Sequence, residues 1–102
     1  MTAPSKEVAE RIVRDLVERG LIACANVLGE VRSIYRWRGA VEEADEVLAV
    51  MKARASDVEA VGRRVKELHP YDVPELIALP IAGGLAEYLE WLVDETRREA
   101  SR

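Results

Sequence analysis

The chain has 102 residues, 49% of them hydrophobic and 33% charged, a composition that suits one domain over residues 1–102. A domain of this length buries only about two-thirds of the surface that its unfolded chain exposes, so we expect self-association to add stability. The formal net charge is −4 with both signs interspersed, which argues against nucleic acid and anionic membranes as partners. One cysteine and an N-terminus without a secretory leader pattern favour a reducing cytoplasm.

The first predicted helix begins after Ser5, whose hydroxyl suits an N-cap, and apolar residues recur at helical spacing until Gly20. From Leu21 to Trp37 the apolar period becomes that of a strand, with a break near Gly29. The sequence therefore predicts a helix followed by an interrupted extended segment.

A second extended run, Val41 to Lys52, follows the Arg38-Gly39 turn and predicts a long hairpin. In an extended strand Tyr35 and Trp37 share one face, whereas Arg36 points to the other. A hairpin of this length extends beyond what a small domain covers, and aromatic residues with arginine are enriched in protein interfaces. We predict that Tyr35 and Trp37 form a subunit interface, the alternative being that they cover the chain's own helices.

A second helix is predicted after Ser56 or Asp57, and it ends before Pro70 because proline disfavours helical geometry in the preceding residue. The stretch ELIALPI, Glu75 to Ile81, is then typical of a buried strand.

A third helix follows Gly83-Gly84, and the basic pair Arg97-Arg98 suits its C-terminal end. The order helix, strand, strand, helix, strand, helix lacks only an opening strand to match the split β-α-β unit. We therefore predict an α+β, ferredoxin-like antiparallel sheet with helices on one face, a C-terminal third helix and a truncated opening strand.

The opening strand of such a fold belongs inside the sheet, yet only Met1 to Pro4 precede the first helix. We expect this position to be filled by a few residues, by another chain, or by a longer natural reading frame that adds a strand ahead of Thr2.

Several spaced motifs are similar to those of one known family. They are ACAN at Ala23–Asn26, SIYRW at Ser33–Trp37, HPYDVPE at His69–Glu75 and YLEWL at Tyr88–Leu92. With them, nearly the whole chain resembles the CutA divalent-cation-tolerance family. The resemblance implies a ferredoxin-like homotrimer, similar in assembly to the PII signalling proteins and linked to tolerance of copper and other divalent cations. Met1 stands where some family members carry a cysteine implicated in metal binding.

Cys24 and His69 are the candidate metal ligands. A thiolate in a pocket between subunits suits a soft cation such as monovalent copper, and an imidazole in a loop is a frequent ligand. The alternatives are a buried, inert thiol and a histidine that caps a helix or faces solvent.

Lys52, Tyr71, Asp72 and Glu75 form a second constellation near predicted strand ends, with Arg36 as a bidentate partner for carboxylate or phosphate. Placed together in a cleft between subunits they would bind a small polar or anionic ligand; apart, each is a solvated surface group.

The leading functional interpretation is thus a trimeric, non-enzymatic protein that binds copper-like divalent cations. The runner-up is a PII-like signalling module that binds a small ligand between subunits. Hydrolysis of a phosphate ester is the third option, although no phosphate-binding loop or paired catalytic carboxylates are recognisable in the sequence.

Overall fold

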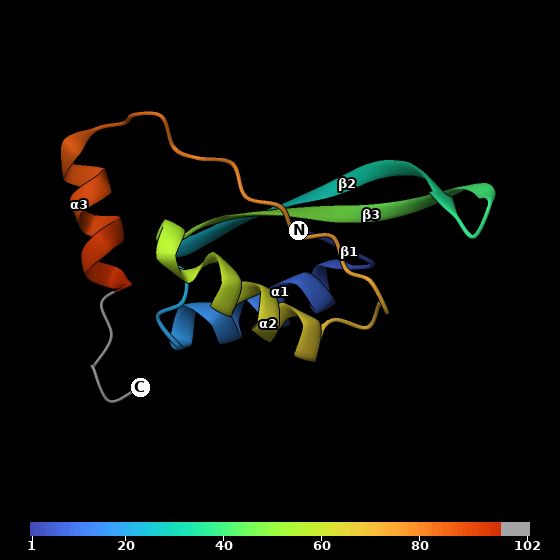
Figure 1. The fold of residues 1–102 in the computed structure, drawn as a ribbon, viewed down its shortest axis with the longest axis horizontal. Helices are drawn as coiled ribbons and strands as arrows, with labels where there is room; N and C mark the ends of the chain where they lie inside the picture. The colour runs from blue at the N-terminus through green and yellow to red at the C-terminus, as the bar shows by residue number, and fades with distance from the viewer. Residues whose placement is uncertain (97–102) are drawn as a thin grey trace.

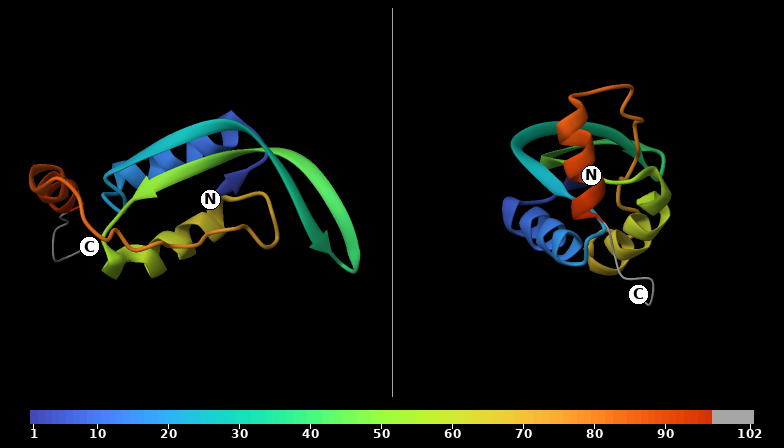
Figure 2. Two further views of the ribbon diagram at one scale, coloured as in Figure 1. Left: turned by 90° about the horizontal axis from the view of Figure 1, so that it is seen from above. Right: turned by 90° about the vertical axis from the view of Figure 1, so that its left-hand side faces the viewer.

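The structure is a computed structural model that describes residues 1–96, and Figure 1 shows its elements. In chain order these are β1 (Thr2–Ala3), α1 (Lys6–Glu18), β2 (Cys24–Trp37), β3 (Ala40–Lys52), the 3-10 turn η1 (Ala55–Asp57), α2 (Val58–Leu68) and α3 (Ala86–Glu95). The strands form an antiparallel sheet of order β1-β3-β2. Helices α1 and α2 cover one face of this sheet, which confirms the predicted α+β class (Figure 2).

Local signals set the ends of the first two helices. The Ser5 hydroxyl accepts the backbone N–H of Val8 at 3.2 Å and caps α1, and the chain leaves α1 through Gly20 at a φ of 71°. Helix α2 ends at His69, which is extended at φ −79° and ψ 138° because Pro70 follows. The predicted boundaries of both helices are confirmed.

The β2–β3 hairpin turns on the two residues predicted for it. Arg38 and Gly39 have φ angles of 52° and 83°, the left-handed pair that matches the twist of two joined strands. The hairpin arm extends well past the helices at one end of the molecule (Figures 1 and 2).

A β-bulge interrupts β2 at the predicted break. Three residue steps on β2, from Leu28 to Val31, lie opposite two steps on β3, from Leu48 to Glu46. The extra residue changes which side chains of β2 point to a given face. Even-numbered residues before the bulge and odd-numbered residues after it therefore share one face.

The helix-covered face of the sheet contains the core. Alternate residues of β3 pack there against both helices, and the buried cluster comprises Met1, Ile12, Val13, Leu16, Ile22, Ala49, Val61 and Val65. No helix of the described residues, 1–96, covers the opposite face, and Leu28 and Val50 on it are 48% and 44% exposed. We call this second face the open face; it also carries Tyr35 and Trp37, so these aromatics lie opposite to α1 and α2.

Two predictions about the sheet are wrong. Residues 75–81 are extended but form no strand, and Ile77 and Leu79 are 71% and 82% exposed instead of buried. Among residues 1–96 the opening strand β1 lies at the sheet edge, paired with β3 alone, instead of inside the sheet. The two corrections share a cause, because the strand that would pair with residues 75–81 is β1, which has only two residues.

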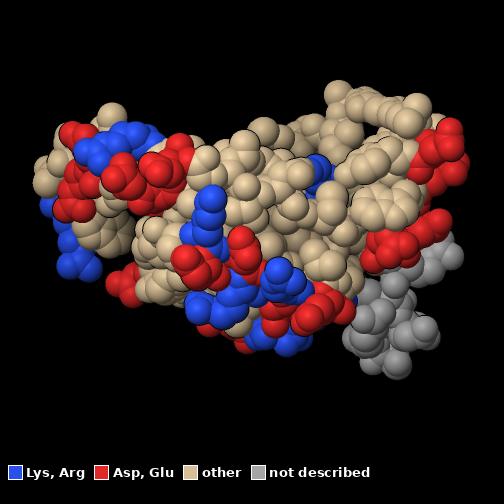
Figure 3. All heavy atoms as spheres, turned by 180° about the vertical axis from the view of Figure 1, so that it is seen from behind, with Lys and Arg blue, Asp and Glu red and all other residues tan. Residues whose placement is uncertain are grey.

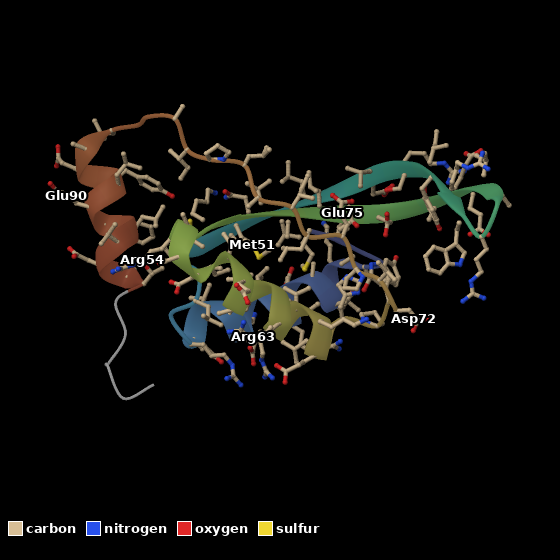
Figure 4. All side chains as sticks on the ribbon, in the orientation of Figure 1. Met51, Arg54, Arg63, Asp72, Glu75 and Glu90 are labelled. Carbon is tan, nitrogen blue, oxygen red and sulfur yellow. The ribbon has the colours of Figure 1, made fainter. Side chains whose placement is uncertain are left out.

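Helix α3 lies at the end of the molecule away from the hairpin turn (Figure 1). Only Leu92 and Thr96 at its C-terminal end are buried, so most of its apolar side chains are uncovered. Arg54, labelled beside the helix in Figure 4, donates to the Thr96 hydroxyl at 2.9 Å and to the Val93 carbonyl at 2.6 Å. The predicted basic pair at 97–98 lies outside the described residues.

Candidate ligand site

Four side chains from three elements meet where β2 begins and β3 ends. The Cys24 sulfur lies 3.3 Å from the Tyr88 hydroxyl of α3, and the Lys52 ammonium donates to the Asn26 side-chain carbonyl. Cys24 and Lys52 are direct partners in the hairpin, so their side chains share the open face, with Cβ atoms about 5 Å apart. We call Cys24, Asn26, Lys52 and Tyr88 the thiol cluster.

The thiol cluster combines a soft nucleophile with hydrogen-bond donors. Lys52 forms no ion pair with an acidic side chain of residues 1–96, so its charge is not balanced by a neighbour. The hydrogen bond with Cys24, and secondarily the loss of hydration, raises the pKa of the Tyr88 phenol. Chemically, the cluster can hold a soft cation through sulfur or a small anion through Lys52.

A second polar group lies near β1 and rests on a buried carboxylate. Glu46 of β3 is only 7% exposed, and its carboxylate accepts a hydrogen bond from the Tyr71 hydroxyl at 2.7 Å. Burial first, and then this bond to an anion, raises the pKa of Tyr71 to about 12. Tyr71 therefore acts as a permanent donor that keeps the carboxylate solvated within the protein.

His69 is buried beside this pair and uses both ring nitrogens. Its Nε2 lies 2.8 Å from the Thr2 carbonyl, and its Nδ1 accepts the backbone N–H of Tyr71 at 3.1 Å. The second bond requires a lone pair on Nδ1, which assigns the neutral tautomer with the proton on Nε2. In this arrangement His69 ties the end of α2 to β1, and a metal ion would have to displace one of these two bonds.

Other predicted ligand-site residues lie apart from the thiol cluster. The Glu75 carboxylate lies 3.5 Å from the Thr2 hydroxyl, near the middle of the molecule in Figure 4. Asp72 contributes its backbone carbonyl as the acceptor for the Lys66 ammonium, not its carboxylate. Arg36 is exposed at the hairpin tip, twelve residues along β2 from Cys24.

A single chain thus does not assemble either predicted site. Lys52 and Arg36 are at opposite ends of the hairpin, and Tyr71 and Glu75 lie between them. The Thr2 carbonyl that holds His69 sits opposite Leu48, four residues or about 13 Å along β3 from the partner of Cys24. Within residues 1–96 there is no group of three or more histidine, cysteine or acidic side chains placed for a metal ion.

Two important residues were not predicted as site residues. Tyr88 lies within the YLEWL motif, where a phenol among apolar residues is the signal that could have marked it. Glu46 directly precedes the apolar run VLAV, Val47–Val50, and an acid that adjoins a buried strand is the available signal.

Comparison with known proteins identifies the family. The profile of the CutA1 divalent ion tolerance protein matches residues 1–95. The chain belongs to the CutA1 family. It is 49% identical over 96 residues to the divalent-cation tolerance protein CutA of Thermus thermophilus, covering 94% of this chain and 93% of the relative. It is 48% identical over 94 residues to the CutA homolog of Xenopus laevis, covering 92% of this chain but 62% of that relative.

Solved structures of the family confirm the fold. The Thermus thermophilus protein superposes with a TM-score of 0.87 at 50% identity, over 89% of this chain and 88% of that one. The periplasmic divalent cation tolerance protein CutA from Archaeoglobus fulgidus superposes with a TM-score of 0.91 at 38% identity, over 94% of this chain and 93% of that one. A rice relative is named chloroplastic, so the family occurs in several compartments, and this chain spans 55% of that relative's length. No helix within residues 1–96 has the length and apolarity needed to cross a membrane.

Proposed function

We propose that this CutA1-family chain serves divalent-cation tolerance as a homotrimer that binds metal ions, copper first, and that it acts by binding and not by catalysis. The observation that supports it is the open face of the sheet, with the uncovered extended segment that follows α2. We propose the cytoplasm as its location, on the grounds of its composition and single cysteine.

The open face favours self-association. A sheet that is apolar on both faces needs a second layer, and the part of the chain that the structure describes supplies helices for one face. The segment after α2 adds further apolar surface, its exposed members being Val73, Ile77, Leu79, Ile81 and Leu85, at 53% to 82% exposure. Exposed apolar side chains in this number are typical of a protein interface. The number of three copies comes from the resemblance to the CutA family.

Metal binding is proposed at the thiol cluster. Cys24 is half-buried and in contact with Tyr88, so its sulfur is reachable from the open face. Thiolates select soft cations such as monovalent copper. One chain offers one thiol, so further ligands would come from neighbouring copies across the interface.

The contacts favour Cys24 over His69 as the ligand, because the imidazole is already bonded at both nitrogens. Titration of the assembled protein with Cu(I) against a chromophoric chelator tests this, using Cys24→Ser and His69→Gln variants. We expect Cys24→Ser to lose most of the copper affinity and His69→Gln to keep it. Equal losses in both variants would establish the shared site that the sequence suggested, and unchanged affinity in Cys24→Ser would refute the thiol site.

Self-association is measured separately by sedimentation equilibrium of the metal-free protein. A mass of three chains is expected at micromolar concentration. A monomer at that concentration would refute the trimer, whatever the copper titration shows.

A small-ligand site between copies is the second candidate function, and the unbalanced charge of Lys52 favours it. An ammonium without an acidic partner, next to an amide and a phenol, suits a carboxylate or phosphate group. Calorimetric titration with a panel of nucleotides, compared between the parent and Lys52→Met, distinguishes this function from metal binding.

A further inference from the structure

We infer that helix α3 is a hinged cover over Cys24 of the thiol cluster and that Arg54 holds this cover closed. In the structure the cover is closed, and the Tyr88 hydroxyl of α3 lies 3.3 Å from the Cys24 sulfur, where it occupies one approach to that atom. Opening of α3 would control access to the metal site proposed above, on which this inference rests.

The segment that leads into α3 is poorly packed. All residues from 77 to 88 are exposed, a stretch that includes the first three residues of the helix. Gly83 and Gly84 lie where the chain turns into α3 (Figure 1). Hinges form at a few such loop positions, which absorb changes in backbone angles. The apolar residues up to Ile81 precede this glycine pair, so they can stay packed against another copy while α3 moves.

The outer side of α3 is surrounded by water. Its ten residues include four acids and no lysine or arginine, and Figure 3 shows acidic atoms at this end of the molecule. Trp91 and Val93 are each 41% exposed, whereas Leu92 and Thr96 are buried. The helix therefore packs on the rest of the chain along one narrow side, near its C-terminal end.

Arg54 makes the closing contact at that end. Its guanidinium donates to the Thr96 hydroxyl at 2.9 Å and to the Val93 carbonyl at 2.6 Å (Figure 4). The last turn of a helix carries partial negative charge, which a cation stabilises. Arg54 comes two residues after Lys52, the direct partner of Cys24 in the hairpin. The strand end that positions Cys24 therefore also holds α3.

The closing contact and the cover move together. Tyr88, Leu92 and Thr96 follow one another at intervals of four residues, so they lie along one side of α3. A rotation about the glycine pair that separates Thr96 from Arg54 also withdraws Tyr88 from Cys24. The sulfur is then open to a metal ion and to ligands from other copies.

Thiol labelling of the metal-free protein tests the cover. Cys24 is the single cysteine, so the rate of reaction with dithiobis-nitrobenzoate, an aromatic disulfide, reports the exposure of this sulfur. At one fixed protein concentration, Arg54→Met should raise the rate roughly tenfold, because hydrogen bonds from a charged group shift a closed-to-open equilibrium by about that factor. The matched control is Arg63→Met, which removes an exposed cation of α2 and should leave the rate unchanged.

Hydrogen exchange distinguishes an opening of α3 from a general loosening of the fold. In Arg54→Met the α3 peptide should exchange faster, whereas the α1 peptide should keep the protection that it has in the parent. An unchanged labelling rate in Arg54→Met would overturn the inference. Equal acceleration of exchange in α1 and α3 would also overturn it, since Arg54 would then support the whole fold.

A double variant tests whether Arg54 acts through Tyr88. Tyr88→Ala should raise the labelling rate by itself, and Arg54→Met should add little in that background. Additive effects would show that Arg54 shields Cys24 by another route and would overturn the inference.

Failure of the metal site gives a different result. If Cys24→Ser keeps its affinity for Cu(I), the metal site is refuted, whereas the labelling rates still decide whether α3 covers the thiol. If Cys24→Ser loses copper but Arg54→Met is labelled at the parent's rate, the metal site stands and the cover is refuted.

Discussion

Replacement of Tyr71 by phenylalanine removes the hydroxyl that donates to the Glu46 carboxylate at 2.7 Å. That carboxylate is on a side chain only 7% exposed, so water replaces the lost donor poorly. Removing one partner of a buried hydrogen bond costs about 1–3 kcal/mol, and bonds to charged groups lie at the upper end. We expect the free energy of unfolding to fall by about 2 kcal/mol in Tyr71→Phe.

Urea unfolding followed by tryptophan fluorescence measures this change, at one fixed protein concentration because association contributes to stability. Tyr88→Phe is the matched control: its hydroxyl contacts the half-buried Cys24 from an exposed helix face, and its loss should cost about 0.5 kcal/mol or less. Glu46→Gln should cost less in the Tyr71→Phe background than in the parent, since the unpaired charge is then absent. Equal stability of the two tyrosine variants would refute the role given to the Tyr71–Glu46 bond.

The same pair predicts a response to alkaline pH. The pKa of Tyr71 is raised from 10.0 to about 12, so the folded chain keeps a proton that the unfolded chain releases. The stability from this group is full below pH 10 and is lost as pH rises toward 12. The difference in unfolding free energy between the parent and Tyr71→Phe should therefore shrink over that interval. A constant difference from about pH 9 to about pH 12 would contradict the assignment.

Three further predictions concern other parts of the chain. Trp37→Ala should raise the dissociation constant of the assembly roughly tenfold or more in sedimentation, because a central indole anchors many interfaces; an unchanged constant would exclude Trp37 from the interface. Hydrogen bonds from Arg64 lower the pKa of the Asp15 carboxyl below 3.8 in the folded chain. The ionised carboxylate therefore stabilises the fold above pH 3.8, and this contribution is lost as the pH falls through the lowered pKa. In Asp15→Asn the unfolding free energy from urea titrations should therefore fall less steeply with decreasing pH below about pH 4. The same steepness as in the parent would contradict this. Gly39→Ala places a side chain at a φ of 83° and should lower the unfolding free energy by about 1 kcal/mol in the same urea assay. Gly83→Ala is the control, because no atom lies within 4 Å of the added carbon, and it should leave the unfolding free energy unchanged. Equal effects of the two changes would show that the turn does not require glycine at position 39.

The parts of the fold that the sequence predicted correctly depend on local chemistry. A capping hydroxyl at Ser5, a proline at position 70 and a turn at Arg38-Gly39 each act on their immediate neighbours, and the structure has a boundary at each. The run at 75–81 has the same local character as a strand, yet a strand exists only where a partner backbone is present. The short β1 was foreseen as a truncated opening strand, but the pattern of residues 75–81 does not itself show that they depend on a longer partner strand.

The candidate site was less predictable because its contacts join distant parts of the chain. Cys24 and Tyr88 are 64 residues apart, and Tyr71 and Glu46 are 25 apart. By residue type alone, Cys24 and His69 are both candidate metal ligands. The hydrogen bonds at both ring nitrogens instead give His69 a structural role within the chain. The sequence shows which chemical groups are present but not which of them already form hydrogen bonds within the fold.

The bulge in β2 determines which side chains of the outer half of the hairpin point to the open face. With the extra residue, Tyr35 and Trp37 fall in line with Glu46 and Cys24. A deletion of one residue there would turn the whole outer half over and present Arg36 to the open face in place of the aromatics. Deletion of one codon at this point would thus replace the side chains on the open face by those of the opposite face, without changing any other residue. The number of residues between Leu28 and Val31 therefore constrains the exposed surface of the hairpin as strongly as the residue types do.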